Sequence, residues 1–445
     1  MKLALIGGGG LRSPLFVDCT LRRAKALGLS EIVLMDIDPD QLALILPICH
    51  AIIERSGVSL ALKATTDPAE ALRGADFVVT TIRPGGIAGR IADETIAASE
   101  GVLGQETTGA GGFAMALRSI PTIVGYARMM SDLCPDAWLI NFTNPAGLVA
   151  QALHDAGFDR VVGICDSANG AQSAVARALG VPTQAVEADL FGLNHLSFAP
   201  AVRYKGQDVL AGMLARDDFL AGTALSVFDP ALVRRQGMWI NEYLWYYWSI
   251  DAALEAQARK GGRGAEIAAL NADFLPRLRA GGNSQATLQV YEDYEAARSG
   301  SYMRSARAED VAAPQAAPEG EGYAGVALDV ISALRGLGAI RTGLNVVNGK
   351  TLTDLLPGDV VEVSCHIDET GIVPVPVGAM PPVQRELVTT VKLYERMTVA
   401  AVAERDRALA VDALMVHPLV QSRRVAGRLV DRFLSAHALY SGEWP

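Results

Sequence analysis

One cysteine and one histidine in the middle of the chain have side chains that could together bind a divalent metal ion. Cys165 ends an apolar run in the sequence GICDS, and His195 lies in GLNHL. A thiolate and an imidazole are ligands that borderline divalent metals accept, and two protein ligands leave coordination positions open for a substrate. A cysteine at a strand end is also often a small buried side chain, and spacing alone favours that simpler interpretation. Both interpretations stay open at this point.

A run of four glycines near the N-terminus could bind a cofactor that contains phosphate. The run consists of Gly7, Gly8, Gly9 and Gly10 and follows a short apolar segment. The backbone N–H groups of such a turn, with the N-terminus of the following helix, can face a pyrophosphate that side chains would otherwise obstruct. The run departs from the GxGxxG pattern, so a purely structural turn between a strand and a helix is the alternative.

Asp36 strengthens the cofactor interpretation. It stands at the end of the second predicted strand, where a carboxylate can bind the ribose hydroxyls of NAD. The same negative charge would repel the 2′-phosphate of NADP. The sequence therefore predicts NAD as the cofactor, with the four glycines and Asp36 as its binding residues.

Two further stretches are unusually polar for the edge of a sheet. They are residues 105–112 (QETTGAGG) and residues 141–147 (NFTNPAG). The second follows the carboxyl end of a predicted strand, where open α/β sheets bind their ligands. An asparagine before a proline is equally typical of an ordinary turn. On its own, this stretch does not decide between a binding loop and a turn.

The elements that must position these residues alternate in the first half of the chain. Short apolar runs, each nearly continuous, are separated by helical segments, which indicates a parallel sheet covered on both faces. Asp38 is expected to cap the helix that follows the second strand. The predicted strands span residues 2–6, 31–35, 61–65, 76–80, 137–142 and 160–165.

The regular alternation of short apolar strands and helices ends at about residue 170. Strands are predicted over 187–191, 199–204 and 360–366, long helical regions over 210–278 and 383–417, and a surface loop over 299–322. The fold class is therefore α/β, with an N-terminal Rossmann-like, doubly wound parallel sheet followed by an α+β part. We expect an NAD-binding domain over 1–170 and a substrate, metal and oligomerisation domain over 171–445.

Composition excludes several classes of function. Of the 445 residues, 39 are Lys or Arg and 49 are Asp or Glu, giving a net charge of −10, so general binding to nucleic acid is not expected. No apolar stretch reaches the roughly 20 residues that span a bilayer, and no membrane attachment is expected. The five cysteines are scattered and form no CxxC pair, which favours reduced thiols in a cytoplasmic protein.

The sequence resembles glycoside hydrolase family 4, the NAD- and metal-dependent glycosidases, and especially its 6-phospho-β-glucosidase branch. The resemblance runs nearly from end to end, and three of its motifs discriminate best: residues 105–112, 141–145 and 193–195. The matching motifs are the turn at 7–14, RPGG at 83–86 with Arg90, GQETTG at 104–109, NFTNP at 141–145, GIC at 163–165, GLNHL at 192–196, NEYL at 241–244, RGAE at 263–266 and HPLV at 417–420.

This resemblance implies roles for individual residues. It makes Cys165 and His195 the ligands of a metal that is usually manganese. Tyr243 becomes the general base, with Tyr246 and Tyr247 as alternatives in the same aromatic stretch, where helix packing is the competing explanation. The residues implied to contact the sugar or its 6-phosphate are Arg90, Asn144, Asn194 and Arg263, with Arg83 as a weaker candidate.

The resemblance also implies a reaction unlike that of most glycosidases, which use two carboxyl groups. NAD would oxidise C3 of a 6-phospho-β-glucoside, and the metal would assist removal of the C2 proton by Tyr243. Elimination of the aglycone, addition of water and return of the hydride would complete the cycle. A small phosphorylated glycoside is thus the expected partner, together with other copies of the chain in a homodimer or homotetramer.

One departure keeps alternatives open. Asp166 follows Cys165 where phospho-β-glucosidases more often carry asparagine, and aspartate is similar to the phospho-α-glucosidase branch. A phospho-α-glucosidase, or an enzyme for unphosphorylated sugars, is therefore the first alternative. An NAD-dependent dehydrogenase of the lactate/malate type is the second, because its first half would look similar. A sensor that binds a sugar phosphate or NAD without catalysis is the third.

Overall fold

A single large sheet organises the computed structural model, which describes residues 1–303, 306 and 322–444. Among these residues, nine strands form this sheet in the order β13-β12-β11-β6-β5-β4-β1-β2-β3. The strands from the first half are mutually parallel, as predicted. They are β1 (Lys2–Ile6), β2 (Glu31–Met35), β3 (Ala61–Thr65), β4 (Phe77–Thr80), β5 (Trp138–Asn141) and β6 (Val161–Gly163).

Helices cover both faces of this parallel region, which confirms the Rossmann-like prediction. The strands β1, β2 and β4 are buried along almost their whole length, as expected for apolar runs between two helical layers. The Asp38 side chain accepts hydrogen bonds from the N–H groups of Asp40 and Gln41 and caps its helix as predicted. The helices of this half are α1 (Ser13–Leu27), α2 (Pro39–Ser56), α3 (Pro68–Leu72), α4 (Gly86–Ser99), α5 (Gly109–Leu133), α6 (Ala146–Asp155) and α7 (Gly170–Leu179).

The second half of the chain contributes strands to two sheets. A hairpin of β7 (Val186–Leu193) and β8 (Leu196–Tyr204) pairs with β10 (Trp239–Ile240) and β9 (Gln207–Asp208). Three later strands instead extend the large sheet next to β6, in antiparallel orientation. They are β11 (Ile340–Val347), β12 (Val360–Asp368) and β13 (Gly371–Pro374). The large sheet is therefore shared between both halves, while the predicted boundary near residue 170 remains a prediction.

The rest of the second half is mainly helical, as predicted. The region 383–417 divides into two helices at Arg405, whose backbone is left-handed (φ 57°), and Asp406 caps the second. Of the predicted loop at 299–322, residues 304–305 and 307–321 lie outside the described part of the chain. The helices are α8 (Leu210–Leu214), α9 (Asp217–Ala221), α10 (Pro230–Gln236), α11 (Trp245–Trp248), α12 (Ile250–Lys260), α13 (Arg263–Arg279), α14 (Ser284–Gly300), α15 (Gly322–Leu334), α16 (Pro382–Glu404), α17 (Arg407–Val416), α18 (Arg423–Ala436) and α19 (Ala438–Ser441).

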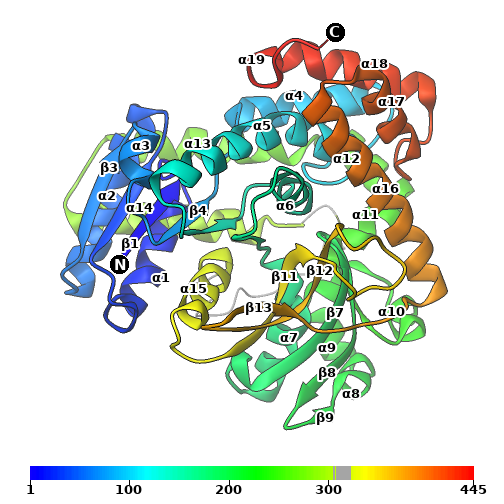
Figure 1. Cartoon of the computed structure of the whole chain (residues 1–445), viewed down its shortest axis with the longest axis horizontal. Helices are drawn as coiled ribbons and strands as arrows, with labels where there is room; N and C mark the ends of the chain where they lie inside the picture. The colour runs from blue at the N-terminus through cyan, green and yellow to red at the C-terminus, as the bar shows by residue number, and fades with distance from the viewer. Residues whose placement is uncertain (304–305, 307–321, 445) are drawn as a thin grey trace.

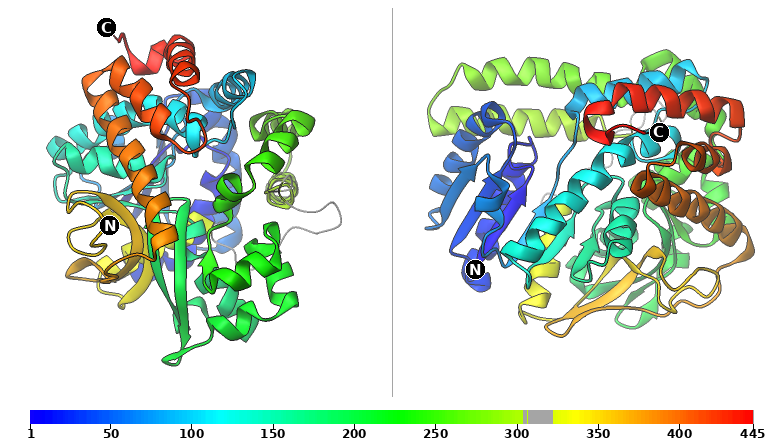
Figure 2. Two further views of the ribbon diagram at one scale, coloured as in Figure 1. Left: turned by 90° about the vertical axis from the view of Figure 1, so that its right-hand side faces the viewer. Right: turned by 45° about the horizontal axis from the view of Figure 1, so that its top comes forward.

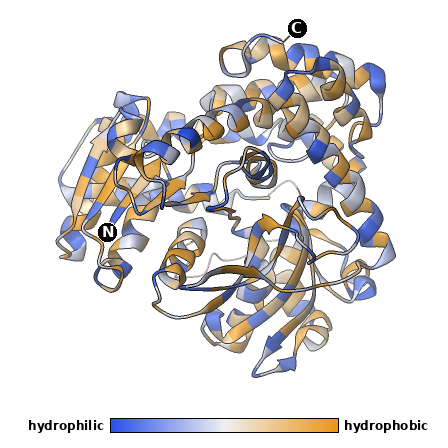
Figure 3. Ribbon diagram, in the orientation of Figure 1, coloured by the Kyte–Doolittle hydropathy of each residue, from blue (hydrophilic) through white to orange (hydrophobic). Residues whose placement is uncertain are grey.

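Three groups of elements surround the middle of the molecule. Figure 1 shows the N-terminal strands with α1 to α3 on the left, the hairpin sheet with β11 to β13 at the lower right and the C-terminal helices at the top, around α6. The helices α13 and α14 pack on α4 and α2 and extend over the N-terminal strands (Figure 2). Apolar residues follow the strands and the inner helix faces (Figure 3). No helix of the described residues has the length and apolar character needed to cross a membrane.

Candidate active site

The fold brings Cys165 and His195 together. Cys165 follows β6, and His195 lies in the tight turn between β7 and β8, so the two come from different sheets. The Sγ atom of Cys165 is 3.3 Å from Nε2 of His195, and both residues are buried. The described residues contain no group of three or more Cys, His, Asp or Glu side chains arranged around one metal position. That Cys165 and His195 bind a metal ion stays a prediction.

Thr107 and Gln105 fix the orientation and tautomer of His195. The Thr107 hydroxyl lies 2.8 Å from Nδ1 of His195 and donates its own proton to the Oε1 atom of Gln105, 3.1 Å away. Since that oxygen can only accept, the Thr107 hydroxyl accepts from Nδ1, and Nε2 is left with a lone pair directed at Cys165. The backbone of His195 is left-handed (φ 61°), a conformation uncommon for residues other than glycine and typical of functional sites.

Burial makes this pair suitable for a cation. It lowers the pKa of His195 to about 3, so the imidazole is neutral at physiological pH and able to act as a ligand. Burial, with the nearby carboxylates of Asp166 and Glu362, raises the pKa of the Cys165 thiol well above its ordinary value. A positive charge beside the sulfur would lower the pKa of this thiol again and so offset the effects of burial and of the two carboxylates. His195 is a neutral imidazole with an available lone pair, and Cys165 is a thiol near carboxylates. This pair fits a divalent cation.

Tyr243 lies directly on this pair. Its ring stacks on the imidazole of His195 with the centroids 3.8 Å apart and the planes 5° from parallel. Asn241 accepts a hydrogen bond from the backbone N–H of Tyr243 and fixes the short turn that carries it. Tyr246 lines the same cleft, but its hydroxyl points to the sulfur of Met303, and the Tyr247 hydroxyl points to His417. Of the three tyrosines, Tyr243 is the one whose ring stacks on His195.

Tyr302 and Glu242 form a hydrogen-bonded pair next to Tyr243. Tyr243 is hydrogen bonded to Tyr302, and the Tyr302 hydroxyl donates to Oε1 of Glu242 over 3.2 Å. Burial raises the pKa of Tyr243 above its ordinary value, and it raises the pKa of Glu242 to about 7. The second oxygen of Glu242 is buried with no hydrogen-bond partner in the part of the chain that the structure describes.

The glycine run forms the other end of the site. Gly7 has a left-handed backbone (φ 96°), and a Cβ atom there would lie 2.7 Å from the carbonyl oxygen of Thr81. The Oδ2 atom of Asp36 accepts a hydrogen bond from the N–H of Gly9 over 3.0 Å, so the carboxylate is anchored beside the turn. A turn that cannot accommodate side chains, with a carboxylate at the end of β2, fits a dinucleotide as the sequence predicts.

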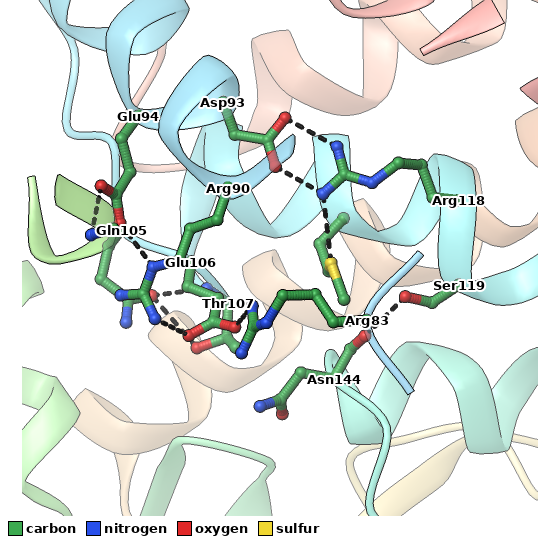
Figure 4. A network of polar contacts seen from close by, with 12 residues as sticks. Arg83, Arg90, Asp93, Glu94, Gln105, Glu106, Thr107, Arg118, Ser119 and Asn144 are labelled. Carbon is green, nitrogen blue, oxygen red and sulfur yellow. Dashed lines mark hydrogen bonds and ion pairs between the residues drawn. The ribbon is translucent and has the colours of Figure 1, made fainter. Parts of the chain in front are cut away.

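Charged side chains line the wall between these two ends (Figure 4). Glu106 accepts from Nη1 of Arg90 over 2.6 Å and pairs with Arg83, while Nε of Arg90 donates to Glu94 over 2.7 Å. Burial, and next the positive charge of Arg90, lower the pKa of Arg83 to about 9. The two guanidinium groups are thus paired with the carboxylates of Glu94 and Glu106, and an anionic ligand would share them with these carboxylates. Asn144 lines the same cleft, and its backbone carbonyl accepts a hydrogen bond from the Ser119 hydroxyl (Figure 4).

The remaining predicted contacts divide into two groups. Arg263 faces the cleft, but its guanidinium donates to Ser301 and to the Arg298 carbonyl and pairs with Glu266. Asn194 lines a separate small cavity instead, and its amide donates to a buried carboxylate rather than to the cleft. The structure therefore brings Arg83, Arg90, Asn144 and Arg263 to one cleft and leaves Asn194 outside it.

One cleft of about 3030 Å³ connects the glycine turn, the arginines and the Cys165–His195 pair. It begins at Gly7, Gly9, Gly10 and Asp36, passes the arginines and reaches Cys165, His195 and Tyr243. This volume is several times that of an ordinary small-molecule pocket and has room for a dinucleotide and a second ligand end to end. The cleft can therefore bring a cofactor ring and a substrate to the same pair of residues.

Sequence reasoning assigned no role to several residues of this site. Gln105, Glu106 and Thr107 stand in a motif that marked the resemblance, and their position before the N-terminus of α5 was an available signal. Glu242 precedes Tyr243, and Glu362 stands between two valines in the buried part of its strand. A carboxylate inside a buried strand is costly and therefore a usable signal for a polar network.

Comparison with known proteins identifies the sequence family. The sequence model described as "Family 4 glycosyl hydrolase" matches residues 2–181, and that of the "Family 4 glycosyl hydrolase C-terminal domain" matches residues 190–420. A probable 6-phospho-β-glucosidase of Bacillus subtilis is 30% identical over 99% of this chain and 97% of its own length. The 6-phospho-β-glucosidase of Escherichia coli is 30% identical over 98% of this chain and 95% of its own length.

The fold also matches a solved structure. The 6-phospho-β-glucosidase of Thermotoga maritima, determined with manganese, NAD⁺ and glucose-6-phosphate, superimposes with a TM-score of 0.83. The alignment covers 99% of each chain at 24% sequence identity. This likeness confirms the α/β fold with its N-terminal Rossmann-like region.

Proposed function

Because the chain belongs to family 4 of the glycosyl hydrolases, we propose that it hydrolyses 6-phospho-β-glucosides with the help of NAD and a divalent cation, in the first place Mn²⁺. The observation that carries the proposal is the convergence of Cys165, His195 and Tyr243 at the inner end of a cleft that begins at the glycine turn. The relatives' names supply the substrate class, and this geometry supplies the chemistry.

Two bound groups would share the cleft. NAD, when bound by Gly7–Gly10 and Asp36, accepts a hydride from C3 of the sugar and later returns it. A divalent cation, when held by Cys165 and His195, acts as a Lewis acid toward the neighbouring sugar oxygens. The chain's own contribution to these groups is a glycine turn without side chains, a neutral imidazole of fixed tautomer and a desolvated thiol.

Tyr243 is the proposed general base. Its stacking on His195 places the phenol beside the metal-type residues, and the hydrogen bond to Tyr302 orients its hydroxyl. Once C3 is a ketone, the proton on C2 is acidic enough for a positioned side chain to remove it. A cation held by Cys165 and His195 would lower the pKa of the Tyr243 hydroxyl, and the resulting phenolate would take that proton before the aglycone leaves C1.

The two paired arginines are the proposed site of the 6-phosphate. Arg83 and Arg90 share Glu106, so two guanidinium groups lie around one carboxylate in a buried wall. Burial, and next the positive charge of Arg90, lower the pKa of Arg83 to about 9. A phosphate presents oxygen acceptors to which guanidinium groups bind in a bidentate manner. Asn144 and Arg263 line the same wall and complete the proposed contacts. Binding energy from this remote group would position C2 and C3 for reaction.

A second candidate is hydrolysis of the α-anomer, and the observation that favours it is Asp166. Asp166 lines the cleft next to Cys165, and its Oδ1 atom lies 3.8 Å from the Sγ atom of Cys165. The anomeric preference is therefore the first property to measure.

The decisive experiment compares four chromogenic substrates: 4-nitrophenyl α- and β-glucosides, each with and without a 6-phosphate. With NAD, Mn²⁺ and a thiol reductant, we expect nitrophenol release from the phosphorylated β-glucoside, its loss on chelation and its return with Mn²⁺. His195→Ala should abolish the activity. Net accumulation of NADH without cleavage would contradict the proposal and indicate a dehydrogenase. Binding without any turnover would indicate a sensor.

Two further properties rest on the family alone. We propose that the protein is cytoplasmic, in keeping with its five scattered cysteines, which form no CxxC pair. We also propose that it forms a homodimer or homotetramer. Light scattering coupled to size-exclusion chromatography would measure the mass directly, and a monomer at micromolar concentration would contradict the second proposal.

A further inference from the structure

One buried carboxylate has no place in the proposed reaction. Glu362 lies in the middle of β12, is completely buried and does not line the cleft. Its Oε1 atom accepts hydrogen bonds from two amides, Nδ2 of Asn194 over 3.1 Å and Nδ2 of Asn345 over 3.2 Å. Its Oε2 atom has no hydrogen-bond partner among the residues that the structure describes. A carboxylate that shares one oxygen between two side chains links whatever those side chains hold.

The first partner leads to the histidine. Asn194 is the residue immediately before His195 in the turn between β7 and β8. That turn carries a left-handed backbone at His195, so it depends on contacts from outside to keep its conformation. The bond from Asn194 to Glu362 attaches the turn to β12, a strand of the other sheet.

The second partner leads to the cysteine. Asn345 on β11 stands opposite Gly163 in the strand pairing, and its Nδ2 also lies 3.5 Å from the Gly163 carbonyl oxygen. Gly163 ends β6 two residues before Cys165. A Cβ atom on Gly163 would lie 2.8 Å from the Cβ of Asn345, so the two backbones are packed as closely as glycine allows.

We propose that Glu362 is a positioning residue that sets the spacing between Cys165 and His195. It does so by joining the chain segment before each of them through one carboxylate oxygen. The inference rests on the proposed function in one respect only, namely that the pair binds a divalent cation. The competing explanation is that Glu362 merely stabilises the fold, in which case its loss would lower stability without changing the affinity of the folded protein for the cation.

Two substitutions at Glu362 separate these explanations. Glu362→Gln keeps an oxygen that can accept from both amides, whereas Glu362→Met keeps the volume and removes the acceptor. The dissociation constant of Mn²⁺ would be measured by electron paramagnetic resonance of the free ion. The midpoint of thermal unfolding would be measured in the absence of metal. We expect Glu362→Met to weaken Mn²⁺ binding by about 10- to 100-fold, the range seen when supporting groups around metal ligands are lost. Glu362→Gln should bind Mn²⁺ more tightly than Glu362→Met does, because it keeps the acceptor, and any loss relative to wild type measures the removed negative charge near Cys165.

Ser364→Ala is the matched control. Ser364 is a buried residue of the same strand, and its hydroxyl ties β12 to β7 by accepting from the N–H of Leu190 and donating to the Ala188 carbonyl. This variant removes a β12–β7 link of similar burial that does not lead to the turn. It should lower the thermal midpoint and leave the Mn²⁺ affinity unchanged.

Several outcomes would overturn the inference. Wild-type Mn²⁺ affinity in Glu362→Met would do so, and so would an equal loss in Ser364→Ala. If Glu362→Met does not fold, Asn194→Ala and Asn345→Ala each remove one side of the link, and unchanged affinity in both variants would overturn it. A wild-type protein that binds no Mn²⁺ contradicts the proposed function instead, which keeps the two failures distinguishable.

Discussion

At the scale of single residues, the site depends on side chains that fix other side chains. His195 becomes a usable ligand because the Thr107 hydroxyl accepts a hydrogen bond from the Nδ1–H group, and it accepts there because it donates its own hydrogen bond to Gln105. Burial alone would leave either tautomer available. The direction of the Nε2 lone pair is therefore decided by two residues that never touch the sulfur of Cys165.

Thr107→Val tests this dependence. Valine has nearly the same shape but cannot accept a hydrogen bond, so the imidazole loses the group that fixes its tautomer. We expect Mn²⁺ to bind about 10- to 100-fold more weakly, as measured by titration calorimetry. Thr107→Ser, which restores the hydroxyl, should recover most of the affinity. Equal affinities of the valine variant and the wild type would show that the tautomer is fixed in another way.

Tyr243→Phe tests the proposed base. Removal of the hydroxyl should leave binding of glucose-6-phosphate intact, because the ring still packs on His195, and should lower kcat by about 10²- to 10⁴-fold. Exchange of the C2 hydrogen with deuterium from D₂O, followed by mass spectrometry, should fall with it. Tyr246→Phe is the control and should exchange normally. If Tyr246→Phe loses the hydrogen exchange and Tyr243→Phe keeps it, Tyr246 is the base instead of Tyr243.

At the scale of elements, helix α4 organises the charged wall. Arg90, Asp93 and Glu94 lie on its buried side (Figure 4), and each has a partner on a different element. Asp93 binds the guanidinium of Arg118 on α5 in a bidentate manner. Glu94 accepts both from Nε of Arg90 and from the backbone N–H of Gly264 near the start of α13. Helix α4 thereby connects Arg90 to Arg118 on α5 and to the start of α13.

Glu94→Gln should uncouple α4 from α13. An amide retains only one accepting oxygen, so either Arg90 or the N-terminus of α13 loses its partner. We expect the dissociation constant of glucose-6-phosphate to rise about 10- to 100-fold, equivalent to one lost hydrogen bond to a charged group. Calorimetric titration measures this change. Glu292→Gln, which removes an exposed ion pair with Arg55, is the control and should bind normally; an unaltered Glu94→Gln would refute the coupling.

At the scale of the whole molecule, the two halves share one sheet and one cleft. Strands β11 and β12 from the second half continue the parallel sheet beyond β6, which places the residues after β6 beside the hairpin turn. The cleft then extends from the glycine turn of the first half to the tyrosine of the second. Cofactor and substrate sites are therefore parts of one continuous structure.

Buried titratable groups give the folded molecule a pH dependence of its own. Burial lowers the pKa of His417 to about 3, compared with an ordinary value of 6.5. Below pH 6.5 the unfolded chain binds a proton at this residue and the folded chain does not, so stability falls as the pH falls. Glu242 and Glu362 act in the opposite sense, because burial raises their pKa values to about 7 and stability is lost as the pH rises from 4.5 to 7.

His417→Gln isolates the histidine contribution. Glutamine does not titrate and can still accept from the N–H of Leu419, as Nδ1 of His417 does. Relative to wild type, the free energy of unfolding of the variant should improve by about 1.4 kcal/mol for each pH unit from 6.5 toward 4.5. Urea denaturation at several pH values measures the difference. A difference that stays constant with pH would mean that His417 titrates normally in the folded protein.

Local sequence patterns were enough to predict the parallel strands and the glycine turn with Asp36, whereas the ligand roles of Cys165 and His195 were implied by the family resemblance. The strands and the turn follow from local rules: apolar runs form buried strands, glycine permits a close backbone turn, and polar residues after a strand lie at the sheet edge. The capping of α2 by Asp38 belongs to the same class, since a helix cap involves only neighbouring residues.

Only the tertiary structure decided which residues meet across the chain. Thr107 beside His195, Glu106 between two arginines and Glu362 between Asn194 and Asn345 join positions far apart in sequence. It also turned Asn194 away from the cleft, although its position next to His195 suggested a contact with the sugar. Such pairings depend on how strands from both halves are ordered in one sheet, and no periodicity in a single segment encodes that order.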